Sequence, residues 1–174
     1  VGGFANSTGD AVFDETLSTA LKVQLAQSPF LDIVPDDRVS ETLRLMQRSD
    51  EERLTHDSAR QVCERLGLKA MLDGTIAALG SHYVLTLDAT DCHSGDSIGR
   101  EQGEARSKEE VLRVLGPMAS AMRTRLGESL PSIKQFDLPI EQATTPSLAA
   151  LKAYTLGIAE RRRGRELESV AVFN

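Results

Sequence analysis

The chain has 174 residues, of which 40% are hydrophobic, and a formal net charge of −6 at pH 7. That length and apolar content suffice for one ordinary domain with a real core and a small appendage. Only 4% of the residues are aromatic and none is tryptophan. Nucleic-acid binders usually carry a basic surface and often stack bases on aromatic rings, so composition argues against a nucleic-acid partner.

Neither a membrane span nor a targeting segment is predicted. No run approaches the roughly 20 apolar residues that cross a bilayer, and residues 1–10 lack the basic and apolar regions of a signal peptide. We expect a soluble fragment that starts within a strand and stops at Asn174 inside a helical pattern. A membrane anchor would then lie in a part of the protein that is missing here.

The first third of the chain is expected to alternate between strand and helix. Residues 1–4 read as a truncated strand, and the turn-forming residues 6–10 follow it. Asp14 is a good N-cap for a helix that ends near Ser28, because apolar residues recur behind it at helical spacing. Residues 31–34 then read as a short apolar strand that Pro35 stops.

Two helices and a three-stranded meander are expected next. One helix should begin at Asp36, and a second should run from an N-cap at Thr55 to Gly67 with Cys63 on its buried stripe. Three extended runs follow, joined by short turns at residues 80–81 and 94–95. They cover residues 71–79, 82–92 and 97–105, and the polar last run suits an edge strand.

A closing helix completes the expected domain. Ser107 and Glu110 have the spacing of a capping box, and an apolar stripe follows over residues 111–126, with a bend expected at Gly116 and Pro117. This order of elements predicts an α/β fold in which helices pack on a mixed sheet of about five strands.

The C-terminal part is expected to form a separate helical hairpin. Residues 135–144 lack periodicity and read as a linker, and Thr145 and Pro146 form a strong helix start. Gly164 should end that helix, and a second should carry Leu167, Val170 and Phe173. The predicted organisation is therefore an α/β domain over 1–134, a linker over 135–144 and a helical segment over 145–174.

One loop could hold an anion. Ser7, Thr8 and Gly9 lie between a strand and a helix, where backbone amides and the helix dipole can bind phosphate. The loop has no lysine, and Asp10 and Asp14 stand close to the helix start, which favours the plainer interpretation of a surface turn. A small nucleotide- or anion-binding enzyme domain is the alternative that this loop leaves open.

No metal site, catalytic residue or cofactor is predicted. The three histidines, His56, His82 and His93, have no second ligand at metal spacing. Asp88, Asp91 and Asp96 miss the register of a calcium loop. The two cysteines, Cys63 and Cys92, permit one disulfide or none.

Residues 4–39, 59–96 and 147–157 together resemble a bacterial family of signalling proteins. They read FANSTGDAVFDETLSTALKVQLAQSPFLDIVPDDRV, ARQVCERLGLKAMLDGTIAALGSHYVLTLDATDCHSGD and SLAALKAYTLG. In that family a domain similar to the TolB amino-terminal domain precedes tetratricopeptide repeats. Such a repeat normally has a Leu-Gly pair, a turn glycine and an aromatic residue, and the matching positions here are Leu156, Gly157, Gly164 and Phe173.

The resemblance implies a function outside the cytoplasm. Such domains form the extracytoplasmic, periplasmic part of membrane-anchored serine/threonine protein kinases or of winged-helix regulators. It implies a non-catalytic sensor domain with a protein or peptide partner, and the chain itself has no G-x-G-x-x-G, H-R-D or D-F-G motif of a kinase. A kinase domain and a membrane anchor would lie in the missing part.

Cys63 and Cys92 are hypothesised to form a disulfide. The helix that carries Cys63 and the strand that ends at Cys92 approach the same end of the predicted sheet, and the resembling family tends to carry cysteines in both segments. Strict alternation opposes the bond, because it places Cys92 on the face opposite Leu85 and Leu87. Two separate reduced thiols are the alternative.

Overall fold

The computed structural model describes residues 1–48 and 54–162. Four strands and seven α-helices lie within that part of the chain. The elements follow in this order: β1 (Phe4–Asn6), the 3₁₀ turn η1 (Ala11–Phe13), α1 (Thr16–Ala26), α2 (Asp36–Leu45), α3 (His56–Arg65), β2 (Ala70–Leu79), β3 (His82–Asp91), β4 (Ser97–Ala105), the 3₁₀ turn η2 (Lys108–Glu110), α4 (Val111–Arg125), α5 (Leu130–Phe136), α6 (Ile140–Ala143) and α7 (Leu148–Arg162).

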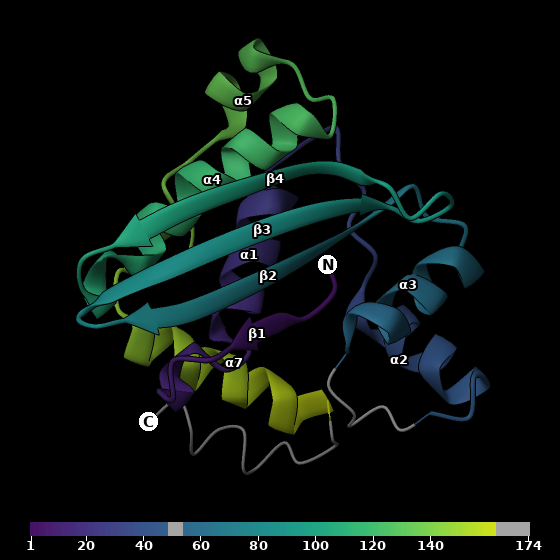
Figure 1. Cartoon of the computed structure of the whole chain (residues 1–174), viewed down its shortest axis with the longest axis horizontal. Helices are drawn as coiled ribbons and strands as arrows, with labels where there is room; N and C mark the ends of the chain where they lie inside the picture. Colours follow the sequence, from purple (N-terminus) through teal and green to yellow (C-terminus); the bar gives the residue numbers. More distant parts are fainter. Residues whose placement is uncertain (49–53, 163–174) are drawn as a thin grey trace.

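The sheet is mixed and has the order β1-β2-β3-β4. The predicted meander is present, with β2, β3 and β4 antiparallel, and β1 lies parallel to β2 at one edge. Figure 1 shows α1 and α4 behind this sheet, α7 below β1, and α2 and α3 at one end. The expected α/β class, with helices covering one face of the sheet, is confirmed.

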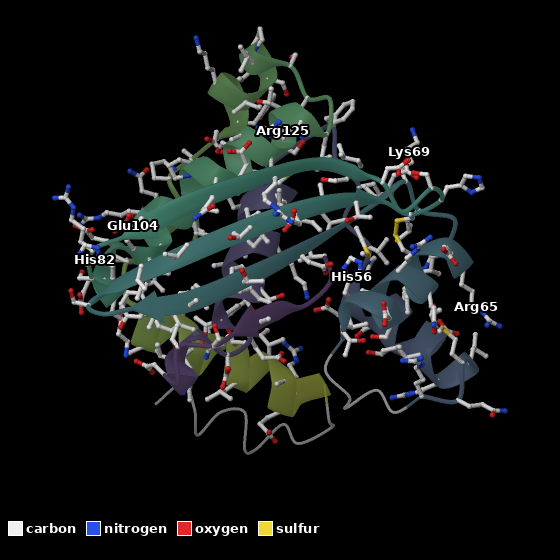
Figure 2. The ribbon with its side chains drawn as sticks, viewed as in Figure 1. His56, Arg65, Lys69, His82, Glu104 and Arg125 are labelled. Carbon is white, nitrogen blue, oxygen red and sulfur yellow. A yellow bond between two sulfur atoms is a disulfide. The ribbon has the colours of Figure 1, made fainter. Side chains whose placement is uncertain are left out.

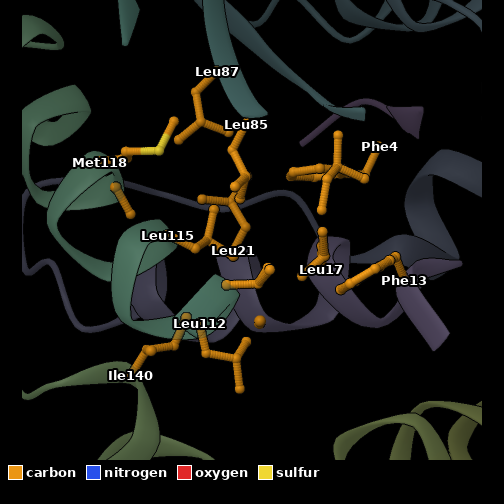
Figure 3. Close-up of a cluster of buried hydrophobic side chains, with 14 of the residues drawn as sticks. Phe4, Phe13, Leu17, Leu21, Leu85, Leu87, Leu112, Leu115, Met118 and Ile140 are labelled. Carbon is orange, nitrogen blue, oxygen red and sulfur yellow. The ribbon is translucent and has the colours of Figure 1, made fainter. Parts of the chain in front are cut away.

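The main core lies between the sheet and the two helices behind it. Alternate residues of β3 point toward α1 and α4, and the apolar stripes of those helices meet them. Fully buried members shown in Figure 3 are Leu17, Leu21, Leu85, Leu87, Leu112 and Leu115. Phe4 adds its ring from β1 and lies across Gly74 of β2, where any Cβ would come within 2.3 Å of the ring.

The expected fifth strand is absent from the described sheet. Residues 31–34 contribute Leu31 and Ile33, which pack partly buried against the main core, but they pair with no strand. The hydroxyl of Ser28 accepts from the amides of Phe30 and Leu31, both at 3.1 Å. These bonds bend the chain where it leaves α1. Residues 31–34, whose composition predicts a strand, instead pack against the core without pairing with another strand.

Two predicted helix caps are wrong. Helix α1 begins at Thr16 after Glu15, and the carboxylate of Asp14 accepts from the Asn6 side chain at 2.9 Å. Glu110 accepts from the amide of Arg106 at 3.0 Å and does not reach Ser107, which makes no side-chain cap. A reciprocal capping box exists instead at the start of α3, between Thr55 and Ser58.

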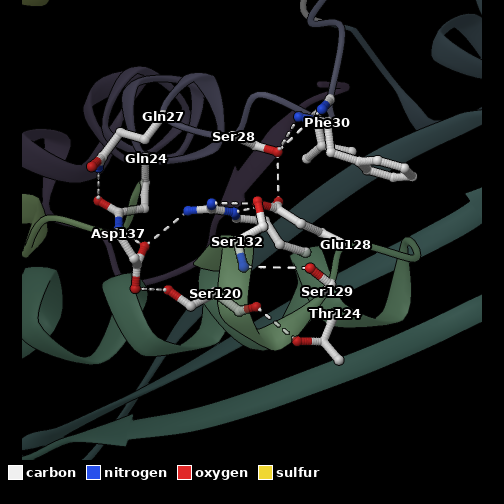
Figure 4. A network of polar contacts seen from close by, with 12 residues as sticks. Gln24, Gln27, Ser28, Phe30, Ser120, Thr124, Glu128, Ser129, Ser132 and Asp137 are labelled. Carbon is white, nitrogen blue, oxygen red and sulfur yellow. Dashed lines mark hydrogen bonds and ion pairs between the residues drawn. The ribbon is translucent and has the colours of Figure 1, made fainter. Parts of the chain in front are cut away.

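A fully buried ion pair joins α4 to the chain that follows it (Figure 4). The guanidinium of Arg123 binds the carboxylate of Glu128 through two bonds of 2.8 Å, and both side chains are 0% exposed. Arg123 also donates to Asp137 at 3.0 Å. The hydroxyls of Ser28 and Ser132 donate to Glu128 at 2.5 and 2.7 Å, so the network fastens residues 128–137 to the core.

The C-terminal segment packs on the α/β core. Residues 135–144, expected to be a linker, contain the short helix α6, and Ile140 is 1% exposed. Leu148 and Leu151 of α7 belong to the same core cluster as α1. The second helix of the predicted hairpin, with Gly164, Leu167, Val170 and Phe173, lies outside the described residues. We still propose that residues 1–134 form one domain and that residues 145–174 form a separate segment. In this proposal, Leu148 and Leu151 of α7 pack the segment against the domain.

Replacing Leu151 by alanine tests how firmly α7 docks. Leu151 is 2% exposed, and truncating such a side chain leaves a cavity, so we expect Leu151→Ala to cost about 2 kcal/mol in urea unfolding. The matched control is Leu156→Ala on the same helix, which is 48% exposed and should cost less than about 0.5 kcal/mol. Equal costs for the two variants would show that α7 does not share the core.

Candidate functional site

A hollow of the surface with a volume of about 1190 Å³ lies along β1, and we call it the β1 cleft. Its lining comes from residues 2–6 along β1, from α2 and the start of α3, from α7, and from the uncovered face of β2, β3 and β4. Figure 2 shows His56 at the end where α3 lies. Segments far apart in the sequence therefore meet around one short strand.

The backbone of β1 is paired on one edge only. The amide of Gly74 donates to the carbonyl of Gly3 at 3.0 Å, and the amide of Ser7 donates to the carbonyl of Ile76 at 2.9 Å. Successive residues of a strand turn their N–H and C=O groups to opposite edges, so Phe4 and Asn6 direct theirs away from β2. Within the described part of the chain, no backbone hydrogen bond satisfies these outward groups.

Two glycines let other segments close one end of the β1 cleft. A Cβ on Gly3 would lie 2.5 Å from the carbonyl oxygen of Leu54, and a Cβ on Gly2 would lie 2.0 Å from Oδ1 of Asp73. The segment before α3 can therefore lie directly against the start of β1. Sequence reasoning missed this role, although a Gly-Gly pair at the edge of a strand often marks close backbone approach.

Charged groups line the β1 cleft, and several are paired across it. Lys22 binds Asp36 at 2.6 Å, and Arg100 of β4 binds Asp88 of β3 at 2.6 Å. The lining has six carboxylates against three cations, a net charge of −3 when His56 is counted as neutral. The carboxylates are Asp14, Glu15, Asp36, Asp73, Asp88 and Glu160, and the cations are Lys22, Lys152 and Arg100. The lining of the β1 cleft therefore has more acidic than basic side chains.

Asp73 occupies a special place at the closed end. Its Oδ2 lies 2.7 Å from Nδ1 of His56. Its Oδ1 is buried and has no hydrogen-bond partner among the described residues. This oxygen lies directly against Gly2, where an added Cβ would come within 2.0 Å of it, so the cost of its burial is borne inside the fold.

The predicted anion loop is closed by its own hydrogen bonds. The amide of Thr8 donates to the Asn6 side chain at 3.0 Å, the amide of Asp10 to the Thr8 hydroxyl at 3.1 Å, and the amide of Val12 to the carboxylate of Asp10 at 2.9 Å. Lys108 also binds Asp10, and this bond is the main reason why the pKa of Asp10 lies below its usual value. An anion at Ser7, Thr8 and Gly9 would have to compete with these bonds and with the Asp10 carboxylate.

The three histidines lie apart. His56 pairs with Asp73, and His82 pairs with Glu104 at the opposite end of the sheet (Figure 2). His93 follows β3 with an exposed side chain. Among the residues that the structure describes, no group of three or more potential ligands could hold a metal ion.

Cys63 and Cys92 are bonded to each other in the structure, with their Cα atoms 5.7 Å apart. Cys92 follows the last residue of β3, and its amide donates to the carbonyl of Lys69 at 3.0 Å, so strict strand alternation no longer fixes its side chain. With Ala59 and Met71 the pair forms a second, small core cluster. The bond fixes α3, and with it one end of the β1 cleft, to the sheet. The oxidation state in solution stays a prediction.

None of the described helices has both the length and the hydropathy needed to cross a membrane.

Comparison with known proteins gives matches in structure only. No family model matches the sequence, and no curated protein is significantly similar to it. The C-terminal domain of LpoB from Salmonella enterica aligns over 61% of this chain and 84% of its own length, with 16% identity and a TM-score of 0.54. The same domain from Escherichia coli aligns over 59% and 77%, with 15% identity and a TM-score of 0.55. Lipoprotein GNA1162 from Neisseria meningitidis has a TM-score of 0.46 and 18% identity over 74% of this chain and 95% of its own.

These findings correct the resemblance drawn from the sequence. The solved structures similar to this chain include C-terminal domains of LpoB, and the assignment to a TolB amino-terminal-like domain followed by tetratricopeptide repeats is wrong. The kinase or winged-helix parent rested on that resemblance, and nothing in the comparisons links the chain to either. At 15–16% identity the likeness concerns the fold alone. Over about three fifths of its length, the chain has the fold of the C-terminal domain of LpoB.

Proposed function

We propose that this chain is a non-catalytic protein-interaction domain that works outside the cytoplasm and binds a protein or peptide partner in the β1 cleft. The observation that carries the proposal is the unpaired edge of β1, whose residues Phe4 and Asn6 line the β1 cleft. Unpaired strand edges are sites where proteins bind other chains.

The paired cysteines support the location. Disulfides persist in oxidising compartments such as the periplasm, and thiols stay reduced in the cytosol. Cys63 and Cys92 are 2% and 1% exposed, so their bond is a buried part of the fold. The fold shared with the C-terminal domain of LpoB is consistent with a domain of this kind.

The side chains of the β1 cleft suit binding better than catalysis. Lys22, Arg100 and His56 each face a carboxylate within 2.7 Å. A catalytic site needs a nucleophile or a general base aimed at a substrate, with the base held by a third group. In the described part of the β1 cleft, His56 is held by Asp73, but no hydroxyl of the lining is hydrogen-bonded to the ring of His56. The loop at Ser7, Thr8 and Gly9 offers no observation that favours the alternative of a nucleotide-binding enzyme.

Photocrosslinking in the native host tests the proposal. A photoreactive benzoylphenylalanine at Thr75, an exposed residue of β2 in the β1 cleft, should give a discrete adduct with one partner protein after export. The matched control carries the same group at Thr124, an exposed position on α4 outside the β1 cleft. Adducts of equal yield at both positions, or an adduct at Thr124 alone, would contradict binding in the β1 cleft.

A further inference from the structure

We infer that the partner segment is an extended basic peptide that adds to the sheet as a strand beside β1. This inference rests on the proposed function, because it assigns the chemistry and the binding mode of the same cleft. The backbone of β1, the contrast between the two sheet edges and the charge of the β1 cleft each support it.

The backbone of β1 supplies the hydrogen-bonding pattern of an added strand. Phe4 and Asn6 are two residues apart, so their outward groups repeat at about 6.6 Å, which is the repeat of alternate residues in any extended peptide. Each of the two residues offers one N–H donor and one C=O acceptor. Because β1 has only three residues, the pairing involves a short segment of the partner.

The two edges of the sheet differ in how they are protected. The other edge strand, β4, carries Arg100, Glu101 and Glu104, and charged side chains are a common means of preventing strands from pairing with other chains. Strand β1 reads FAN and has neither a charge nor a proline. The edge that lacks protection is the one that lines the β1 cleft.

The charge of the β1 cleft selects a basic partner. Its lining has six carboxylates and three cations, a net charge of −3 when His56 is counted as neutral. A basic peptide would gain from this potential, and its binding should weaken as salt is added.

Peptides selected from a random displayed library against the oxidised 174-residue chain provide the test. Asn6→Pro removes the outward N–H, and proline is tolerated on a strand edge that faces away from its neighbour. The matched control is Asn6→Ala, which loses the same side-chain bonds to Thr8, Asp10 and Asp14 but keeps the N–H. We expect selected peptides to be basic and to bind Asn6→Pro roughly tenfold more weakly than Asn6→Ala, as the loss of about one hydrogen bond implies.

A second measurement does not depend on the folding of the proline variant. Methylating the peptide backbone at alternate nitrogens should abolish binding in one of the two alternating sets and spare it in the other, because only one edge of an added strand faces β1. Equal effects of the two sets, or equal binding to Asn6→Pro and Asn6→Ala, would overturn strand addition.

Two further variants separate this inference from the proposed function. Glu15→Lys and Asp73→Asn change the charge of the β1 cleft without touching the backbone of β1. If these variants weaken binding but proline and methylation do not, the β1 cleft binds the peptide by another mode and only strand addition fails. If neither the two charge variants nor the Asn6 variants change binding, or if no peptide is selected, both strand addition and the proposed function fail.

Discussion

Arg123→Met is expected to lower the free energy of unfolding by about 3–5 kcal/mol, the usual cost of removing one partner from a buried ion pair. Methionine fills much of the space of the arginine stem, so the loss would come mainly from the Glu128 carboxylate. That carboxylate would stay buried with only the hydroxyls of Ser28 and Ser132 as donors. Urea unfolding of the two proteins at pH 7 measures the difference.

The neighbouring Arg125 provides a matched control. It lies on the same helix and pairs with Glu101, but its side chain is 49% exposed. Exposed ion pairs contribute little, so Arg125→Met should cost less than about 1 kcal/mol. In the double variant Arg123→Met with Glu128→Gln, no charge is left unpaired at this position, and its cost should be smaller than the sum of the two single costs. Equal losses for Arg123→Met and Arg125→Met would contradict the buried network.

The same network predicts how stability depends on pH. The bond from Arg123 is the largest cause that holds the pKa of Glu128 at about 2, against its ordinary value of 4.5. A carboxyl group whose pKa is lower in the folded state stabilises it fully above the ordinary pKa, and this stabilisation is lost as pH falls toward the folded value. About 3 kcal/mol should therefore disappear between pH 4.5 and 2 in the parent protein. The advantage of the parent over Arg123→Met should shrink over the same range.

Replacing both cysteines by serine is expected to lower stability by roughly 3–4 kcal/mol. The bond closes a loop with a sequence separation of 29, and this is the magnitude that the chain-entropy model gives for such a loop. Most of the loss should appear in the end of the sheet where Cys63 joins α3 to Cys92. Denaturant unfolding under oxidising conditions measures it.

Reduction supplies the control for the cysteine variant. A reducing agent should destabilise the parent protein to about the level of the double variant and should leave that variant unchanged. Counting thiols in denatured, non-reduced protein from the periplasm of an expression host should give none. Two free thiols there would contradict the bond and, with it, the support for a location outside the cytoplasm.

The sequence was most informative where the periodicity is local. The meander of β2, β3 and β4 and the helices around Leu17, Cys63 and Leu115 follow from apolar spacing and turn residues within short windows. The predictions that were wrong concern segments whose structure depends on residues far away in the sequence. Residues 31–34 have the composition of a strand, but no strand lies beside them to pair with.

The sequence gives only a weak indication of the buried ion pair between Arg123 and Glu128. Arg123 falls on the same helical face as Leu112 and Ala119, where a charge interrupts an apolar stripe. Such a position indicates a buried partner only when a carboxylate is known to reach it, and Glu128 reaches it through the turn after α4. The family resemblance also failed, since similarity over residues 4–39, 59–96 and 147–157 did not determine which proteins share the fold.

The β1 cleft could not be predicted from the sequence. Its lining combines residues from β1, α2, α3 and α7, which only the folded chain brings together. The sequence predicted residues 1–4 as a strand, but not that one of its edges would stay unpaired. The loop at Ser7, Thr8 and Gly9 could be singled out as a possible anion site because its residues are neighbours in the sequence. Its hydrogen bonds, however, are made within the loop.

Amide hydrogen exchange with and without the crosslinked partner tests binding at β1 most directly. The amides of Phe4 and Asn6 have no acceptor among the described residues, so they should exchange rapidly in the free protein and at least tenfold more slowly in the complex. Protection should extend to other residues that line the β1 cleft. Rapid exchange of Phe4 and Asn6 in the complex, with new protection confined to the exposed apolar residues Phe30, Leu130 and Phe136, would contradict it.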